Sequence, residues 1–219
     1  MITINHHVAN PLTPKGEGSA KIEQLFRAYF AQKPDITGRI DIFSNVSVSS
    51  QMEYLMEIDL FIICEFNGFI LSDFYEYNGS CYDLEIKNLA FTLEMKHHDF
   101  SRIERRGPDL YVRYGSRVEN ATEQSRKAKC ILTNSINKRL KRSPFVFDYL
   151  WCSSLDKNAV NTIDNGDGLN LLPSSFDVED LISQTYNQRL PIGDSDTDRR
   201  VVSSWRDDLY DSIVDLFSR

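Results

Sequence analysis

Two hydrophobic periods alternate along the chain and predict both helices and strands. From Ser19 onward, apolar residues recur at i, i+3, i+4 and i+7, which predicts an amphipathic helix that ends before Pro34. The same spacing over residues 120–140 predicts a second, longer helix. Strands are predicted where apolar residues alternate or form short runs, at residues 39–48, 56–64, 68–79, 89–96, 110–114 and 145–151.

The order of these elements predicts an α/β fold, with a mixed central β-sheet flanked by helices. The first fifteen residues contain two prolines, Pro11 and Pro14, so we expect an irregular lead-in. A segment rich in Asn, Asp and Gly (156–170) predicts a loop, and short helical patterns follow at 177–188 and 201–217. We therefore expect one domain over residues 1–155 and a C-terminal helical extension, or a linker to a following domain, over residues 156–219.

Composition narrows the class of protein. No apolar run approaches the roughly 18–20 residues of a membrane span, and the N-terminus lacks the apolar stretch of a signal peptide, so we expect no membrane partner. The four cysteines are scattered and form no C-x-x-C pair, which argues against a zinc site or disulfide framework and favours the cytoplasm. The chain also lacks the glycine-rich loops by which many proteins bind ATP or dinucleotides.

The net charge of −7 conceals an uneven distribution. Residues 96–142 contain 13 Lys/Arg and 5 Asp/Glu, a balance of +8, whereas residues 1–95 (6 against 13) and 143–219 (6 against 14) are acidic. Phosphate binding depends on the local field, so the middle third is the candidate nucleic-acid surface, with a solvated helix face as the alternative. The candidate phosphate contacts are Arg126, Lys127, Lys129, Lys138, Arg139, Lys141 and Arg142.

The strand predicted at 89–96 has the cleanest period of two and carries an acid and a base on one face. Glu94 and Lys96 are two residues apart, so their side chains project on the same side. Asp59 lies within the preceding apolar strand, where a charge is costly to bury unless it is paired or binds a metal. If the strands are neighbours, both carboxylates and the Met95 carbonyl offer the oxygen ligands that Mg²⁺ takes. Lys96 would then hold or deprotonate the attacking water.

A solvent-facing ion pair on an edge strand is the simpler interpretation of one Glu-x-Lys triplet. A second copy, Glu85-Ile86-Lys87, lies just upstream, and we favour the later copy for its strand context and the helix downstream. Gln124 supports this choice, since it shares a helical face with Ala128 and Ile131 and should point inward, where it could orient the lysine or a substrate phosphate. A helix-start residue satisfied by the backbone is the alternative role of Gln124.

The first helix offers a further carboxylate. Glu23 lies about 100° from Ile22 around the helix axis, beside the apolar stripe, from where it could reach a metal ion. Glu17 is the competitor, in a segment expected to precede the helix. The histidine pairs 6–7 and 97–98 are weaker candidates, because neighbours on a strand point to opposite faces and cannot easily share one metal.

These residues form an ordered series: Gly16-Glu17, Glu23, Glu57-Ile58-Asp59, Leu93-Glu94-Met95-Lys96 and Ala121-Thr122-Glu123-Gln124. The series resembles the nuclease-related domain, NERD, a family of the PD-(D/E)XK nuclease superfamily, over roughly residues 15–152. The interval from Asp59 to Glu94 is longer than in compact members, and segment 98–124 is most similar to members fused to helicases. The resemblance implies a restriction-endonuclease-like core, metal ligation by Asp59 and Glu94, a helix acid (Glu23 or Glu17), Lys96 at the nucleophilic water and Gln124 as a helper.

We therefore expect a phosphodiesterase that uses Mg²⁺ or Mn²⁺ to hydrolyse DNA, within a protein that also contains a helicase, ATPase or kinase domain. The choice of DNA over RNA comes from the resemblance alone. The alternative is a catalytically inactive nucleic-acid-binding or protein-interaction module of the same fold. A purely structural adaptor is a third possibility, and it predicts no salt-sensitive binding of DNA.

Overall fold

The structure, a computed structural model, describes residues 1–7, 13–49, 55–77, 80–164, 169–188, 192–193, 199–206 and 208–218. Its helices are α1 (Pro14–Ala31), η1 (a 3-10 turn, Phe100–Arg102), α2 (Ala121–Leu140), α3 (Lys157–Asp164), α4 (Val178–Ser183), α5 (Thr185–Gln188) and α6 (Tyr210–Phe217). Its strands are β1 (Ile2–His7), β2 (Thr37–Ser49), β3 (Leu55–Asn67), β4 (Ile70–Tyr77), β5 (Ser80–Lys96), β6 (Ile103–Arg106), β7 (Asp109–Tyr114), β8 (Arg117–Asn120), β9 (Val146–Cys152), β10 (Leu171–Leu172), β11 (Ile192–Gly193) and β12 (Arg199–Ser203).

The described strands form one sheet of nine strands and a separate sheet of three, β6-β7-β8. The larger sheet runs in the order β1-β2-β3-β5-β12-β11, with β4 also paired to β5, and β9 between β5 and β10. Strands β2, β3 and β5 are antiparallel neighbours, whereas β1 runs parallel to β2, and β9 and β12 run parallel to β5. The predicted mixed α/β fold with a mixed central sheet is therefore confirmed.

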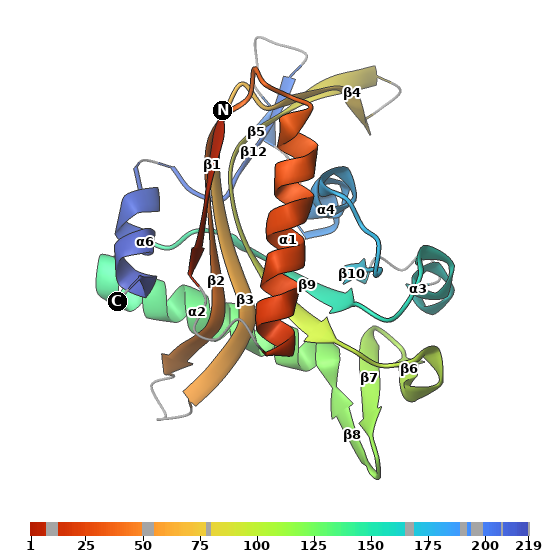
Figure 1. The fold of residues 1–219 in the computed structure, drawn as a ribbon. Helices are drawn as coiled ribbons and strands as arrows, with labels where there is room; N and C mark the ends of the chain where they lie inside the picture. Colours follow the sequence, from red (N-terminus) through yellow and green to blue (C-terminus); the bar gives the residue numbers. More distant parts are fainter. Residues whose placement is uncertain are drawn as a thin grey trace.

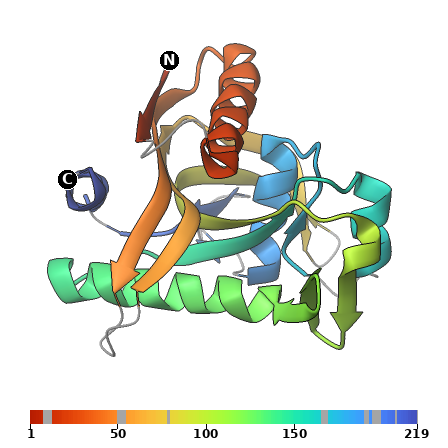
Figure 2. The same cartoon turned by 60° about the horizontal axis from the view of Figure 1, so that its bottom comes forward.

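Helices cover both faces of the large sheet, which lies between α1 and α2 in Figure 2. On one face, α1 and α4 bury Ile22, Phe26 and Leu181 in a shared core, while on the other α2 and α6 bury Leu132, Ile136 and Ile213. A smaller third core lies between the three-stranded sheet, α3 and the end of β9. None of these helices, within the described ranges, is long and apolar enough to cross a membrane.

Strand β5 follows the predicted period of two over residues 89–96 and extends further upstream than predicted. Leu89, Phe91, Leu93 and Met95 pack in the core under α1, whereas Ala90 packs in the core under α2. The first half of β5 pairs with β4 and β12, and the second half pairs with β3 and β9. Both edges of this strand are thus occupied along most of its length.

The N-terminal region differs from the prediction of an irregular lead-in. Residues 2–7 form β1, which pairs in parallel with β2 from the Ile2–Gly38 pair to the His7–Phe43 pair. Helix α1 begins at Pro14 rather than Ser19, because Thr13 caps it by accepting the Gly16 backbone N–H (3.1 Å) and proline fits the first helical position. The two glycines that follow lower helix propensity and hide this start in the sequence.

The C-terminal region also differs from the predicted extension or linker over residues 156–219. Helix α4 packs in the core under α1, β10 pairs with β9, and β12 lies in the large sheet beside β5. The helix predicted at 201–217 is a strand, β12, followed by the shorter helix α6. The described residues after 155 therefore belong to the same sheet and cores as those before it.

If α6 is integral to the fold, Ile213→Ala should lower the free energy of unfolding by about 2–5 kcal/mol, since Ile213 is fully buried and its loss leaves a cavity. Ser212→Ala, an exposed neighbour on the same helix, is the matched control and should change little. Urea denaturation of both variants measures the difference. Equal stability of the two variants would show that α6 adds nothing to the core.

Candidate active site

Four predicted residues, Asp59, Glu94, Lys96 and Gln124, meet where β5 ends. Figure 1 shows the start of α1, the end of β5 and the start of α2 converging above the β7–β8 hairpin. Asp59, Glu94 and Lys96 are all more than nine-tenths buried, with 3–6% of each residue exposed. We call these four residues the cluster.

A backbone hydrogen bond fixes Asp59 at the junction of two strands. The antiparallel pairing of β3 with β5 reaches the Leu60–Leu93 pair, and the next residues along each strand are Asp59 and Glu94. There the Met95 backbone N–H donates to Asp59 Oδ2 at 2.8 Å. The Asp59 carboxylate therefore accepts the hydrogen bond that a backbone carbonyl of β3 would otherwise accept. This bond fixes the carboxylate just beyond the last β3–β5 pair.

Lys96 is the centre of the cluster. Its ammonium donates to Glu94 Oε1 at 2.9 Å and to Gln124 Oε1 at 3.0 Å, and lies 3.4 Å from the Tyr114 hydroxyl. The inward direction predicted for Gln124 is confirmed, and its amide oxygen accepts a hydrogen bond from the lysine. Tyr114 was not among the predicted site residues, because its strand gave no sign of which element it would face.

Lys15 is a second cation at the cluster, and sequence reasoning missed it. Its ammonium lies 2.6 Å from Asp59 Oδ1 and 2.8 Å from Glu57 Oε1. The side chain reaches this position because α1 starts at Pro14 and its first turn lies against the end of β5. The signal that could have found it is Thr13-Pro14, a capping residue followed by the preferred first residue of a helix.

Gly18 explains how closely α1 approaches the sheet. A Cβ atom at this position would overlap the Met95 side chain and lie 3.3 Å from the Trp151 ring. The glycine thus lets the first turns of α1 lie directly on β5 and β9, which brings Lys15 within reach of Asp59.

Burial and the charge of Asp59 raise the pKa of Glu94 to about 7, despite the opposing effect of Lys96. For Lys96, burial lowers the pKa, but the attraction of Glu94, its hydrogen bond and Tyr114 together outweigh burial, so the pKa of Lys96 is raised. The pKa of Lys15 is raised in the same way, with burial opposed by Asp59 and Glu57. Both lysines are therefore ammonium groups at neutral pH, whereas Glu94 changes its charge close to it.

Neither acid proposed from the first helix joins the cluster. Glu23 lies eight residues beyond Lys15, about 12 Å along the axis, and pairs with His6 Nδ1 at 3.0 Å and with Arg27 at 2.7 Å. Its partner on β1 was unforeseen because that strand was not predicted. Glu17 lies in the first turn of α1 and is exposed. We therefore leave both residues out of the candidate site.

The upstream Glu-x-Lys copy occupies a different environment. Glu85 pairs with Ile70 and Val201 in the first half of β5, roughly 30 Å along the strand from Glu94. Lys87 is exposed, whereas Lys96 is buried. The preference for the later copy agrees with this placement, since only that copy lies beside Asp59.

The seven basic residues proposed for phosphate binding divide into two groups on α2 and just beyond it. Arg126 pairs with Asp109, Lys127 with Glu123, and Lys129 with Asp148, the last at 2.7 Å. The Lys129 side chain is also only 27% exposed, and it pairs with Asp148 beneath the helix. The remaining four are exposed and lie at the C-terminal end, with residue 139 about 20 Å from Gln124 along the helix: Lys138, Arg139, Lys141 and Arg142.

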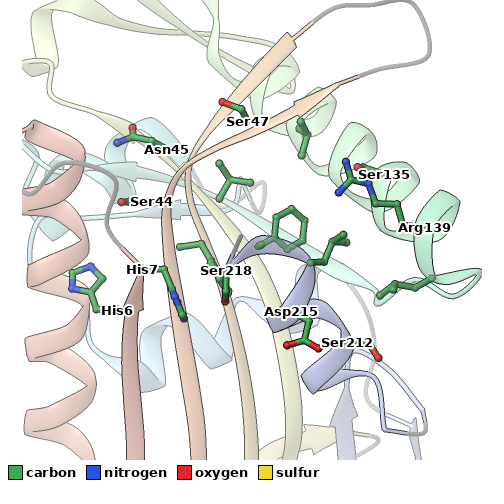
Figure 3. A pocket seen from close by; sticks show the side chains of 16 residues that line it. His6, His7, Ser44, Asn45, Ser47, Ser135, Arg139, Ser212, Asp215 and Ser218 are labelled. Atoms are coloured by element: carbon green, nitrogen blue, oxygen red, sulfur yellow. The ribbon is translucent and has the colours of Figure 1, made fainter.

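A large cavity of about 1070 Å³ lies away from the cluster, between the ends of β1 and β2, α2 and α6. Figure 3 shows Arg139 of α2 and Asp215 of α6 on its wall, and His6 and His7 turned to different sides of β1. His7 lies 2.6 Å from Asp41, and His6 pairs with Glu23, so the two rings do not share a ligand position. None of the four cluster residues lines this cavity.

The cluster offers two carboxylates to a metal ion. Within the described ranges, no group of three or more His, Cys, Asp or Glu side chains is arranged to hold a metal. Two carboxylates nevertheless suit Mg²⁺, which commonly keeps several waters and adds substrate phosphate oxygens as ligands. The donor set therefore fits a hard divalent cation, provided that the Lys15 ammonium leaves Asp59 Oδ1.

Comparisons of the chain with family models, with curated proteins and with solved structures found no match.

The raised pKa of Glu94 predicts how stability depends on pH. Between the ordinary pKa of 4.5 and about 7, the folded protein binds a proton that the unfolded chain has lost, so stability falls as pH rises through this window. The effect is up to roughly 3 kcal/mol for a shift of this size. Denaturation of the natural protein and Glu94→Gln at several pH values measures it. A parallel pH dependence of the two proteins would contradict the shift.

Proposed function

We propose that this protein is a nuclease of restriction-endonuclease-like fold that uses Mg²⁺ or Mn²⁺ to hydrolyse phosphodiester bonds of DNA. The observation that carries the proposal is the buried Lys96, held between Glu94 and Gln124, with Asp59 on the neighbouring strand. Buried charges of this kind are costly to maintain unless they serve binding or chemistry, and they gather at functional sites. The mixed sheet with helices on both faces is compatible with the fold that the resemblance implies.

Lys96 is the residue that meets the reacting groups. As an ammonium with raised pKa it donates hydrogen bonds and does not remove a proton; the donor that faces the Tyr114 hydroxyl, the longest of its three contacts at 3.4 Å, would turn to an attacking water or a phosphate oxygen. Gln124 fixes the direction of that ammonium through the hydrogen bond to its amide oxygen. Asp59 and Glu94 would hold the divalent ion, which when bound stabilises negative charge on the phosphate and lowers the pKa of bound water.

The DNA substrate and any partner domain belong to the proposal as expectations of the resemblance. A helicase, ATPase or kinase domain would supply DNA movement or regulation, whereas the cluster itself accounts only for hydrolysis. The chemistry of Lys96 and two carboxylates applies equally to any phosphodiester. The choice between DNA and RNA therefore depends on surfaces outside the cluster.

One observation favours the alternative of an inactive module of the same fold. Asp59 has both oxygens engaged, one by the Lys15 ammonium and the other by the Met95 N–H. An ammonium at this position neutralises the carboxylate and could replace a metal ion permanently. In an active nuclease Mn²⁺ would displace the Lys15 ammonium from Asp59, whereas in an inactive module the ammonium would stay in place.

Substituting Lys96→Ala should reduce cleavage of plasmid DNA in Mg²⁺ by at least 100-fold, because it removes the hydrogen-bond donor at the reacting phosphate (on the order of 10²–10³ for one such donor). DNA binding should stay close to that of the natural protein, whereas the melting temperature should fall, because Glu94 loses its buried partner, so cleavage is measured well below that temperature. The matched control is Lys87→Ala, in the exposed upstream copy of the motif, which should cleave normally. Undiminished cleavage by Lys96→Ala rejects the proposed role of this lysine.

Removing the competing ammonium should strengthen metal binding. We expect Lys15→Met to bind Mn²⁺ more tightly than the natural protein in calorimetric titration, because Asp59 Oδ1 is freed and one positive charge is removed. Lys21→Met, an exposed lysine on the same helix, is the control. Asp59→Asn should abolish binding in either background. If neither the natural protein nor Lys15→Met binds Mn²⁺, the result contradicts the nuclease and favours the inactive module.

Both metal titrations should also depend on pH. Since Glu94 must lose its proton to become a ligand and its pKa is raised to about 7, Mn²⁺ affinity should rise from below pH 6 to above pH 8.

A further inference from the structure

The three-stranded sheet β6-β7-β8, which we call the wing (residues 103–120), lies beside the cluster. In the chain it stands between β5 and α2, so its two ends adjoin the two elements that carry Glu94, Lys96 and Gln124. One face packs against α3 and β9 through Ile103, Leu110 and Val112, which are buried. Figures 1 and 2 show the β7–β8 hairpin projecting from the body of the molecule.

The wing contacts the cluster through Tyr114, which lies two residues from the buried Val112 and therefore projects on the packed side of the wing. The Tyr114 hydroxyl lies 3.4 Å from the Lys96 ammonium, and the His98 ring packs edge-on against Tyr114 with 4.5 Å between ring centres. The Nδ1 atom of His98 is buried and has no hydrogen-bond partner among the described residues. Burial lowers the pKa of His98, with further contributions from Lys96 and Arg102, so Arg102 stands close to the same corner.

The other face of the wing is exposed and carries arginines. In the strand pairing Arg113 stands opposite Val118, and Glu104 stands opposite Tyr111, which places these four side chains on one face. Arg102 joins them, since it lines the same shallow depression. Arg102 and Arg113 are both exposed, and neither makes an ion pair with a described residue.

The charge of this face comes from those two arginines. Glu104 is neutralised by Arg106 at 2.9 Å, and the Arg106 guanidinium lies 4.8 Å from the centre of the Tyr111 ring. With Glu104 occupied by Arg106, Arg102 and Arg113 leave this partly aromatic surface with a net positive charge. Arginine forks bind phosphate oxygens in pairs, and tyrosine faces accept sugar or base edges, so the surface suits a nucleic-acid backbone.

The wing contacts the cluster directly through Tyr114, at 3.4 Å from the Lys96 ammonium. Of the basic residues predicted from the sequence, three are paired with acids on the first half of α2, and the other four lie about 20 Å or more from Gln124. We propose that a DNA strand whose scissile phosphate lies at Lys96 continues across the exposed face of the wing, where Arg113, together with the adjoining Arg102 of η1, binds its sugar–phosphate backbone. The inference rests on the proposed function, since the cluster must receive that phosphate.

The test is a measurement of DNA affinity against salt concentration, in EDTA so that no cleavage occurs. The double variant Arg102→Gln/Arg113→Gln should lower affinity for a short duplex on the order of 10- to 50-fold near 0.1 M salt, and reduce the slope of log affinity against log salt by roughly 1.8. The matched control, Lys138→Gln/Arg139→Gln, removes the same charge at the far end of α2 and should lower both much less. All four residues are exposed, so melting temperatures should not change.

An unchanged slope in the wing variant, or a larger loss in the control variant, overturns the inference. Failure of the natural protein to bind DNA at low salt overturns both the inference and the proposed function. If binding depends on the wing but Mg²⁺ and Mn²⁺ produce no cleavage, the inference stands and the nuclease proposal falls. If the wing variant binds DNA normally and the natural protein cleaves DNA with Mg²⁺ or Mn²⁺, the nuclease proposal stands and the inference about the wing falls.

Discussion

The hydrogen bond from the Met95 N–H to the Asp59 carboxylate ties the candidate site to the central sheet. It forms where β3 and β5 stop pairing, so a side chain rather than a backbone carbonyl satisfies the donor. A buried peptide N–H left without a partner costs roughly 1–3 kcal/mol, which gives this carboxylate a structural role as well as a chemical one. Glu94 and Lys15 are both arranged around the position that this bond fixes.

The position of Asp59 also decides how the charges of the site are balanced. Two carboxylates and two ammonium groups lie within one buried corner, and each carboxylate is paired with one lysine. Desolvation of such groups is tolerable only when each has a partner of opposite charge. Removing or adding a single charge therefore changes the state of its neighbours, as the shifted pKa of Glu94 already shows. A divalent cation would enter this corner by displacing the Lys15 ammonium from Asp59, since both oxygens of that carboxylate are already engaged.

Local periods in the sequence were sufficient for the centre of the site. A period of two placed Glu94 and Lys96 on one face of β5, and a period of 3.6 turned Gln124 inward on α2. They could not identify neighbours that depend on tertiary pairing. Strand β1 alternates apolar and polar residues beside two histidines without a continuous apolar run, and its pairing with β2 decides where Glu23 points.

The missed elements share a physical cause, which is tertiary context overriding local preference. Residues 201–217 show apolar positions four apart at Val201, Trp205, Leu209 and Ile213, which imitates a helix, yet the first of these lies in β12 because β5 offers an open edge there. The residues on the exposed face of the wing are mostly polar, so the hydrophobic pattern of the sequence did not single out Arg102 or Arg113 as binding residues. Folding brings these two side chains onto one surface.

The long strand β5 also has a consequence for how the molecule assembles. Its second half pairs with strands that lie within about 60 residues of it, whereas its first half pairs with β12, more than 100 residues later in the chain. Closing so long a loop is slow compared with forming local pairs. During synthesis the corner that holds Lys96 has its strand and helix neighbours early, while the opposite end of the same strand waits with an open edge for residues 199–203 to leave the ribosome.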